Sequence, residues 1–191
     1  MSTPPPLPRV FALCGSLRAK SSNLTILRAF ARATAAKLDV VFGPGIDELP
    51  HFNPDLDGDA PPASVVSFRN ALRETDALVI SCPEYVHGMP GAFKNALEWL
   101  VSDVAFMGKP IALINASPES TYADAQLRHT LEVMNARLLN DACITLPLGV
   151  RRFDEAQLIA APAVAAQFAA MAGAIVVATK NKSGRADNAG A

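Results

Sequence analysis

The sequence predicts a single α/β domain with a parallel β-sheet and helices on both of its faces. Five short apolar runs are rich in Val, Ile and Leu, which is typical of strands buried on both faces of a parallel sheet. The segments between them repeat apolar residues every three or four positions, which indicates amphipathic helices. Alternating strands and helices favour a doubly wound sheet with right-handed crossovers. The expected strands are Arg9–Cys14, 38–42, Ala77–Ser81, 109–116 and 142–146.

A helical segment is expected after each of these strands. The second helix, 63–75, follows a polar connection, 43–62, and a loop of that length is uncommon and usually functional. The other helices are identified by their apolar faces. The helix after the first strand has Leu24, Leu27, Ala31 and Ala35, and the helix after the third strand, which follows Pro90, has Ala92, Phe93, Ala96, Leu97, Leu100 and Val101. The helix after the fourth strand has Ala123, Leu127, Leu131, Met134 and Leu138, and the last helix, which begins near Pro162, has Val164, Phe168 and Met171.

Composition narrows the class of protein. Half of the 191 residues are apolar, enough for one substantial core, and the net charge of −1 offers no electrostatic attraction to nucleic acid. No uninterrupted apolar run approaches the ~18 residues of a membrane span, so no membrane partner is expected. Three cysteines in strand-like contexts indicate reduced, buried thiols and a cytoplasmic protein. We expect a flexible lead at 1–8, one domain at 9–178 and a disordered tail at 179–191.

The loop after the first strand has the composition of an anion site. Ser16, Ser21, Ser22 and Asn23 surround Arg18 where a strand turns into a helix. Hydroxyls, the positive end of the helix and a guanidinium together suit a phosphate group. The simpler alternative is a helix N-cap, because Ser and Asn are preferred there. The glycine patterns of a dinucleotide fingerprint and of a Walker loop are both missing.

The loop after the third strand carries an acid, a phenol and an imidazole. Taken alone, Glu84, Tyr85 and His87 could form a general acid–base set, or the loop could be an ordinary surface turn. A planar ligand lying against the loop would explain a large aromatic residue at this edge of the sheet. Ligands of open α/β sheets bind there, beyond the carboxyl ends of the strands.

Two further features have plainer interpretations. Asp55, Asp57 and Asp59 do not complete a calcium-binding loop, so we expect a solvated acidic loop. Trp99 and Leu100 lie beside the core face of the helix that begins after Pro90. They add more apolar surface than one sheet contact needs, which favours an interface between subunits.

The segments GSLRAKSSN and PEYVHGMPGAFKNALEW together resemble the NADPH-dependent FMN reductase family of flavodoxin-like quinone, azo-dye, chromate and flavin reductases. The resemblance extends through LPHFNPDL and KPIALINAS and covers roughly residues 10–148. It implies a flavodoxin-like, five-stranded parallel sheet of order 2-1-3-4-5. FMN would bind at the switch point between strands one and three.

The resemblance also implies roles for individual residues. The ligands of the FMN phosphate would be Ser16, Arg18, Ser21 and Asn23, with Ser22 adjacent. The loop that holds the flavin ring would be formed by Pro83, Glu84, Tyr85, the backbone at Val86, and His87, with Ser117 near the ring. Two departures matter. Many members have Asn and a small or polar residue where Val86 and His87 stand, and the glycine-rich turn after Ser117 is replaced by residues 118–121.

The function implied is an NAD(P)H-dependent oxidoreductase that passes hydride through FMN to a quinone-like or other small acceptor. Either NADPH or NADH would be the co-substrate, and a homodimer or homotetramer is expected. The flavin carries the chemistry, so no catalytic side chain and no metal are expected. Two alternatives remain. One is an electron-carrier flavodoxin without nicotinamide turnover, a class that is usually strongly acidic. The other is a flavin-free anion-binding or scaffold protein.

Overall fold

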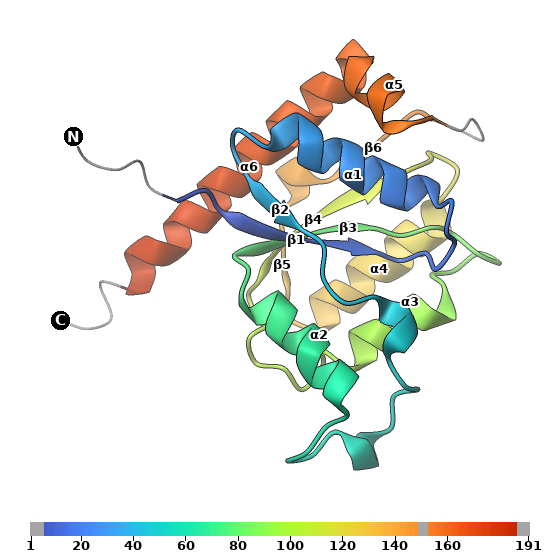
Figure 1. Cartoon of the computed structure of the whole chain (residues 1–191), viewed down its shortest axis with the longest axis vertical. Coiled ribbons are helices and arrows are strands. Elements are labelled where there is room, and N and C mark those ends of the chain that lie inside the picture. Colours follow the sequence, from blue (N-terminus) through green and yellow to red (C-terminus); the bar gives the residue numbers. More distant parts are fainter. Residues whose placement is uncertain (1–5, 149–152, 187–191) are drawn as a thin grey trace.

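The computed structural model describes residues 6–148 and 153–186, with the backbone alone for 181–186. A single β-sheet lies at the centre of the fold, with helices packed around it (Figure 1). Its strands are β1 (Arg9–Cys14), β2 (Asp39–Val41), β3 (Ala77–Ser81), β4 (Pro110–Asn115), β5 (Arg137–Leu138) and β6 (Ile144–Thr145). The order is β2-β1-β3-β4-β5, and β6 also pairs with β4. Every pairing between these strands is parallel, so the predicted order 2-1-3-4-5 is confirmed.

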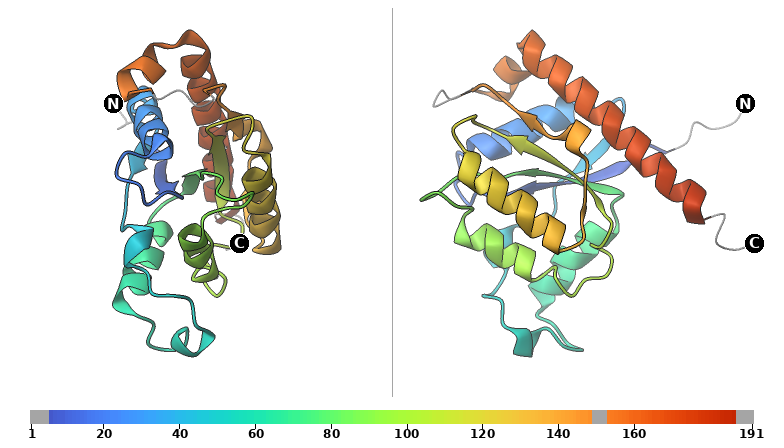
Figure 2. Two further views of the ribbon diagram at one scale, coloured as in Figure 1. Left: turned by 90° about the vertical axis from the view of Figure 1, so that its right-hand side faces the viewer. Right: turned by 180° about the vertical axis from the view of Figure 1, so that it is seen from behind.

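Helices cover both faces of the sheet (Figure 2). One layer contains α1 (Ser22–Thr34), α5 (Glu155–Ala160) and α6 (Pro162–Ala186); the other contains α2 (Ala63–Arg73), α3 (Gly91–Glu98) and α4 (Thr121–Val133). The alternation of side chains along β1 explains the two cores: Val10 and Ala12 pack with α1 and α6, whereas Phe11 and Leu13 pack with α2 and α3. Both layers are therefore specified by strands that are apolar on each face.

The predicted fifth strand is wrong in detail. The region 142–146 holds only β6, and β5 lies further upstream, separated from it by a 3-10 turn at Asn140–Ala142. Leu138, which we assigned to the preceding helix, belongs to β5. The helix α4 stops early because Asn135 adopts φ 55° and Ala136 N donates to Leu131 O at 2.9 Å, the pattern of a Schellman cap.

The last helix is longer than its apolar face predicts. It continues to Ala186, into the segment for which we expected disorder; residues 187–191, like 1–5 of the expected lead, lie outside the described residues. Pro162–Lys180 is also long and apolar enough to cross a membrane, which the search for uninterrupted apolar runs missed. Phe168, Met171 and Ile175 are buried against the sheet, which suits a core helix of a globular protein.

Part of the connection 43–62 packs against α3, whereas most of residues 53–60 are exposed. Pro50 O accepts hydrogen bonds from Asn95 Nδ2 at 3.0 Å and from Trp99 Nε1 at 2.8 Å, and Phe52 N donates to Asn95 Oδ1 at 2.7 Å. Trp99 is buried under this part of the connection, and Leu100 is buried in the same core cluster. The argument for a subunit interface from these two residues was therefore wrong, because both side chains are buried within the chain.

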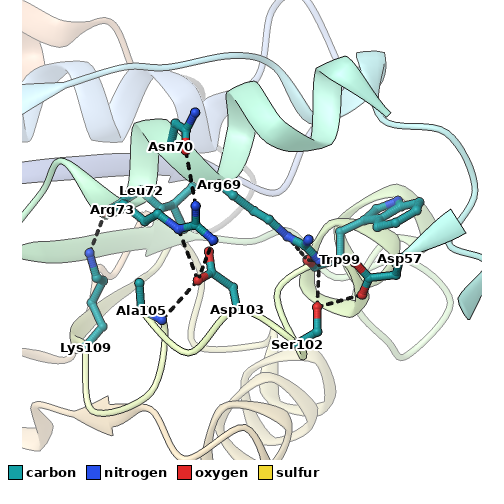
Figure 3. Close-up of polar contacts among 10 residues, drawn as sticks. All are labelled: Asp57, Arg69, Asn70, Leu72, Arg73, Trp99, Ser102, Asp103, Ala105 and Lys109. Atoms are coloured by element: carbon teal, nitrogen blue, oxygen red, sulfur yellow. Dashed lines mark hydrogen bonds and ion pairs between the residues drawn. The ribbon is translucent and has the colours of Figure 1, made fainter. Parts of the chain in front are cut away.

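A buried ion pair holds the far end of this connection (Figure 3). Arg69 Nη2 donates to Asp57 Oδ1 at 2.8 Å and to Ser102 Oγ at 2.9 Å, and Ser102 donates to Asp57 Oδ2 at 2.6 Å. Arg69 Nε also donates to Trp99 O at 2.7 Å. Asp57 is thus paired and not solvated, contrary to our expectation for the acidic loop; Asp55 and Asp59 are exposed.

The network stabilises the charged form of the Asp57 carboxyl. Burial by itself would raise its pKa, but the hydrogen bond from Ser102 and the bond and charge of Arg69 outweigh that effect and hold the pKa below its usual range.

Nearby, Lys109 Nζ donates to the carbonyl O of Thr75 at 2.7 Å and also to that of Leu72, which satisfies carbonyl groups at the C-terminal end of α2.

Candidate functional site

The eleven predicted site residues lie in the loops and turns that follow β1, β3 and β4 and in the first turn of α1, and these three strands are adjacent. Parallel strands end at one edge of the sheet, so these segments are neighbours although they are far apart in the sequence. Among the described residues, no group of three or more His, Cys, Asp and Glu side chains could hold a metal ion.

The loop after β1 divides into buried and exposed parts. Ser21 is the N-cap of α1 and accepts a hydrogen bond from Leu24 N at 3.3 Å, which is the simpler role considered for it. Asn23 is buried, and its Oδ1 lies 2.7 Å from Ser81 Oγ, so it ties α1 to β3. Arg18 and Ser22 are exposed, and Ser16 is partly buried. Two exposed cations, Arg18 and Lys20, thus lie in the segment that leads into the positive end of α1, a composition that suits an anion.

The loop after β3 folds into a two-residue hairpin. Tyr85 N donates to Gly88 O at 2.8 Å, and Gly88 N donates to Tyr85 O at 3.1 Å. Val86 and His87 have φ values of 52° and 57°, the left-handed conformations of a type I′ turn. Val86 is 99% exposed, so no packing compensates a β-branched residue in this conformation.

Replacing Val86 by asparagine should stabilise the fold by about 1 kcal/mol, because the left-handed conformation costs roughly 1–2 kcal/mol for most residues and much less for asparagine. Urea unfolding measures this difference. Val104→Asn is the control, since Val104 is exposed without a positive φ. An equal gain in both variants would mean that lost surface hydrophobicity, not turn strain, explains the effect.

Three contacts join this hairpin to the start of α4. Glu84 Oε2 accepts from Ala123 N at 2.9 Å, and Gln126 Oε1 accepts from Met89 N at 2.8 Å. The ring of His87 lies 4.4 Å from that of Tyr122 in an edge-to-face arrangement. Ser120, the N-cap of α4, makes no cap bond of its own, so the Glu84 carboxylate serves the helix instead. Glu84 is therefore engaged in holding the hairpin.

Sequence reasoning missed Gln126 and Tyr122, because it used only the apolar positions of that helix. It also missed Asn115, whose Oδ1 accepts from Ser117 N at 3.2 Å and whose Nδ2 donates to Ser120 O at 3.1 Å. Asn115 thus shapes the turn that carries Ser117. The hydroxyl of Ser117 donates a hydrogen bond to the Glu119 carboxylate, which lowers the pKa of that carboxyl.

The cysteines are poor candidates for nucleophiles. Cys14, Cys82 and Cys143 are free thiols, and burial raises the pKa of each. For Cys82, beside the hairpin, burial and the nearby Cys14 raise the pKa to about 12. The thiolate is the reactive form, so a raised pKa makes each of these partly buried thiols a weaker nucleophile at neutral pH.

The chain matches the model of the NADPH-dependent FMN reductase family over residues 8–150. It belongs to that family. The quinone reductase of Escherichia coli (strain K12) is 32% identical over 139 residues, 69% of this chain and 73% of the relative. The NAD(P)H-dependent FMN reductase of Pseudomonas aeruginosa is 30% identical over 151 residues, 76% of this chain and 81% of the relative.

A solved structure also resembles this member of the family. FerB of Paracoccus denitrificans, a flavoenzyme NAD(P)H:(acceptor) oxidoreductase, superimposes with a TM-score of 0.73 at 26% identity and covers 92% of this chain and 98% of its own. An archaeal flavodoxin, with a TM-score of 0.58 at 11% identity, shares the fold alone. Membership confirms the expected flavodoxin-like fold, FMN as the flavin and an NAD(P)H-dependent oxidoreductase, and it favours this enzyme over an electron carrier.

Proposed function

We propose that FMN binds across the loops after β1, β3 and β4, that NADPH or NADH reduces it there, and that a quinone-like or other small acceptor reoxidises it. The observation that carries this proposal is the exposed Arg18 in the loop that leads from β1 into α1. The strand before this loop, β1, pairs with β3, the strand before the hairpin. The names of the relatives, a quinone reductase and an NAD(P)H-dependent FMN reductase, support the substrate class.

The residues of the first loop fit FMN in two different roles, contact with the phosphate and support of the loop. Ser16, Arg18 and Ser22 would contact the phosphate, while Ser21 and Asn23, buried and bonded within the protein, keep the loop in shape. A bidentate guanidinium contact and the helix dipole both favour a dianion.

The flavin ring would lie against the hairpin. The surface that contacts the ring would be formed by Pro83, Tyr85 and the backbone at Val86. The surrounding turns would be oriented by Glu84, His87 and Ser117. Tyr85 is 43% exposed, which leaves ring surface for a planar ligand. When bound, FMN supplies the hydride-accepting chemistry, so the protein needs to bind, orient and exclude competing reactions.

An absorbance spectrum of the purified protein, followed by anaerobic addition of NADPH or NADH, tests the proposal. We expect a yellow protein, or FMN uptake by the apoprotein, and bleaching by at least one nicotinamide. Aerobic or quinone-linked turnover then separates a reductase from a carrier. Protein that neither holds nor takes up FMN would contradict the proposal, and bleaching without quinone turnover would favour the carrier.

We also propose a homodimer or homotetramer acting in the cytoplasm. This assembly rests on the family resemblance, since Trp99 and Leu100 are buried within one chain. Light scattering of the FMN-bound protein at micromolar concentration tests it, and a monomer would contradict it.

Glu84→Gln and His87→Ala should retain flavin reduction within about tenfold, a barrier change of ~1.4 kcal/mol or less. Bound FMN would accept hydride directly from the nicotinamide, so neither side chain would be needed as a proton donor, and Glu84 already accepts a hydrogen bond from Ala123 N. Stopped-flow bleaching by NADPH at saturating FMN measures the step. Tyr85→Phe should be milder than Tyr85→Ala, because the ring matters through packing.

The acid–base alternative makes a different prediction for the same variants. General catalysis contributes typically ~10²–10⁴ in rate, so a loss beyond a hundredfold in either variant, with FMN still bound, would establish a proton-transfer role. Glu132→Gln is a matched control, because Glu132 is an exposed carboxylate on the same helix that Glu84 caps.

A further inference from the structure

A cavity of about 330 Å³ lies beside the loop after β1, on the side that faces β2. Residues 16–19 form one wall and residues 42–47, which follow β2, form the other. Leu24 and Arg28 of α1 border it, and Phe11 and Leu13 of β1 lie at its base. It is therefore a groove between two loops at the carboxyl edge of the sheet, where ligands of this fold class bind.

The strand order separates this cavity from the proposed flavin ring site. The sheet runs β2-β1-β3, so the cavity lies between β2 and β1, whereas the hairpin follows β3 on the other side of β1. None of the hairpin residues lines the cavity. FMN that extends from the loop after β1 toward the hairpin would share Ser16 and Arg18 with the cavity and would leave the part between Arg28 and residues 42–47 open.

The lining has the chemistry of a phosphorylated nucleoside site. Arg18 and Arg28 both line the cavity, and within residues 6–148 and 153–186 neither forms an ion pair with a carboxylate. Phe42 is 44% exposed, so its ring can pack against a base. Asp47, across from the arginines, can accept hydrogen bonds from amino or hydroxyl groups.

We propose that this cavity binds the adenosine 2′-phosphate end of NADPH, with Arg28 recognising the 2′-phosphate. The inference rests on the proposed function, since the nicotinamide must reach FMN beside the hairpin. Neighbouring strands lie about 4.8 Å apart, so the end of β2 and the gap between β3 and β4 are on the order of 12 Å apart, a separation that an extended dinucleotide covers. The enzyme therefore prefers NADPH to NADH.

Arg28 is the residue that tests the assignment, because Arg18 also belongs to the proposed FMN phosphate site. Isothermal titration of the FMN-loaded enzyme with adenosine 2′,5′-bisphosphate and with 5′-AMP separates the 2′-phosphate from the rest of the nucleoside. In Arg28→Met we expect roughly 10- to 100-fold weaker binding of the bisphosphate, the loss expected for a charge-assisted contact. Binding of 5′-AMP should change less than threefold.

Kinetics provide the second measurement. The kcat/KM for NADPH should fall by the same factor in Arg28→Met, whereas that for NADH should change less than threefold. Arg32→Met is the control: Arg32 lies one turn further along α1 and pairs with Glu155 at 3.2 Å, outside the cavity. It should leave both nicotinamides unaffected.

Three results would overturn the inference: unchanged bisphosphate binding in Arg28→Met, equal losses for both nucleotides, or release of FMN by the bisphosphate. The last would make the cavity part of the flavin site. Failure of the proposed function can be told apart from failure of this inference. In that case the unmodified protein would bind no FMN, or neither NADPH nor NADH would bleach its flavin.

Discussion

Replacing Arg18 by alanine should raise the dissociation constant of FMN about 30- to 150-fold. Arg18 is exposed beside the N-terminus of α1, where a guanidinium can bind a phosphate through two hydrogen bonds. Losing a charge-assisted contact of this kind costs about 2–3 kcal/mol. Titration of the apoprotein with FMN, followed by quenching of the flavin fluorescence, measures the change.

Lys20→Ala is the matched control, because Lys20 is the other exposed cation of the same loop. It should weaken FMN much less than Arg18→Ala does. Equal losses would indicate a general effect of positive charge, and an unchanged dissociation constant in Arg18→Ala would place the phosphate elsewhere.

The second large effect is on stability. Arg69→Met should lower the free energy of unfolding by about 3–5 kcal/mol, because removing one partner of a buried ion pair leaves an uncompensated charge. The side chains of Arg69 and Asp57 are only 8% and 9% exposed. Urea unfolding measures the loss. Asp57→Asn combined with Arg69→Met should recover part of it, and a double variant as unstable as the sum of both singles would contradict a direct coupling.

The same pair makes stability depend on pH. The pKa of Asp57 is lower in the folded chain than in the unfolded one, so its contribution is complete above the unfolded value near 4 and is lost as the pH falls through the folded value. The urea concentration at the unfolding midpoint should therefore decrease as the pH is lowered below about 4. In Asp57→Asn this decrease should be smaller. An identical acid dependence in both proteins would assign it to other carboxyl groups.

Features with a local signature were predictable from the sequence. Buried apolar runs located β1 and β3, and the polar loops after them contained the candidate site residues. The hairpin was recognised as a loop, but its left-handed turn was not, because Val86 and His87 are unusual residues for that conformation. The short β5 escaped notice since two residues are too few to show periodicity.

Features that depend on contacts between distant segments were not predictable. Glu84 and Ala123 are 39 residues apart, and nothing in either local pattern indicates that a carboxylate from one loop caps the other helix. Asp57 looked solvated because its neighbours are polar, yet Arg69 and Ser102 bury it. Such partners are decided by how the elements pack, which a pattern along the chain does not contain.

The packing of Pro50 against Trp99 gives the protein an internal optical probe. Trp99 is the sole tryptophan of the sequence, and its indole is buried, bonded to Pro50 O and edge-on to Phe52 at 5.0 Å. Releasing the connection 43–62 would expose the indole while the sheet stays intact. Emission should then shift to longer wavelength at lower denaturant than the loss of far-ultraviolet dichroism, so opening of this connection can be timed separately from global unfolding.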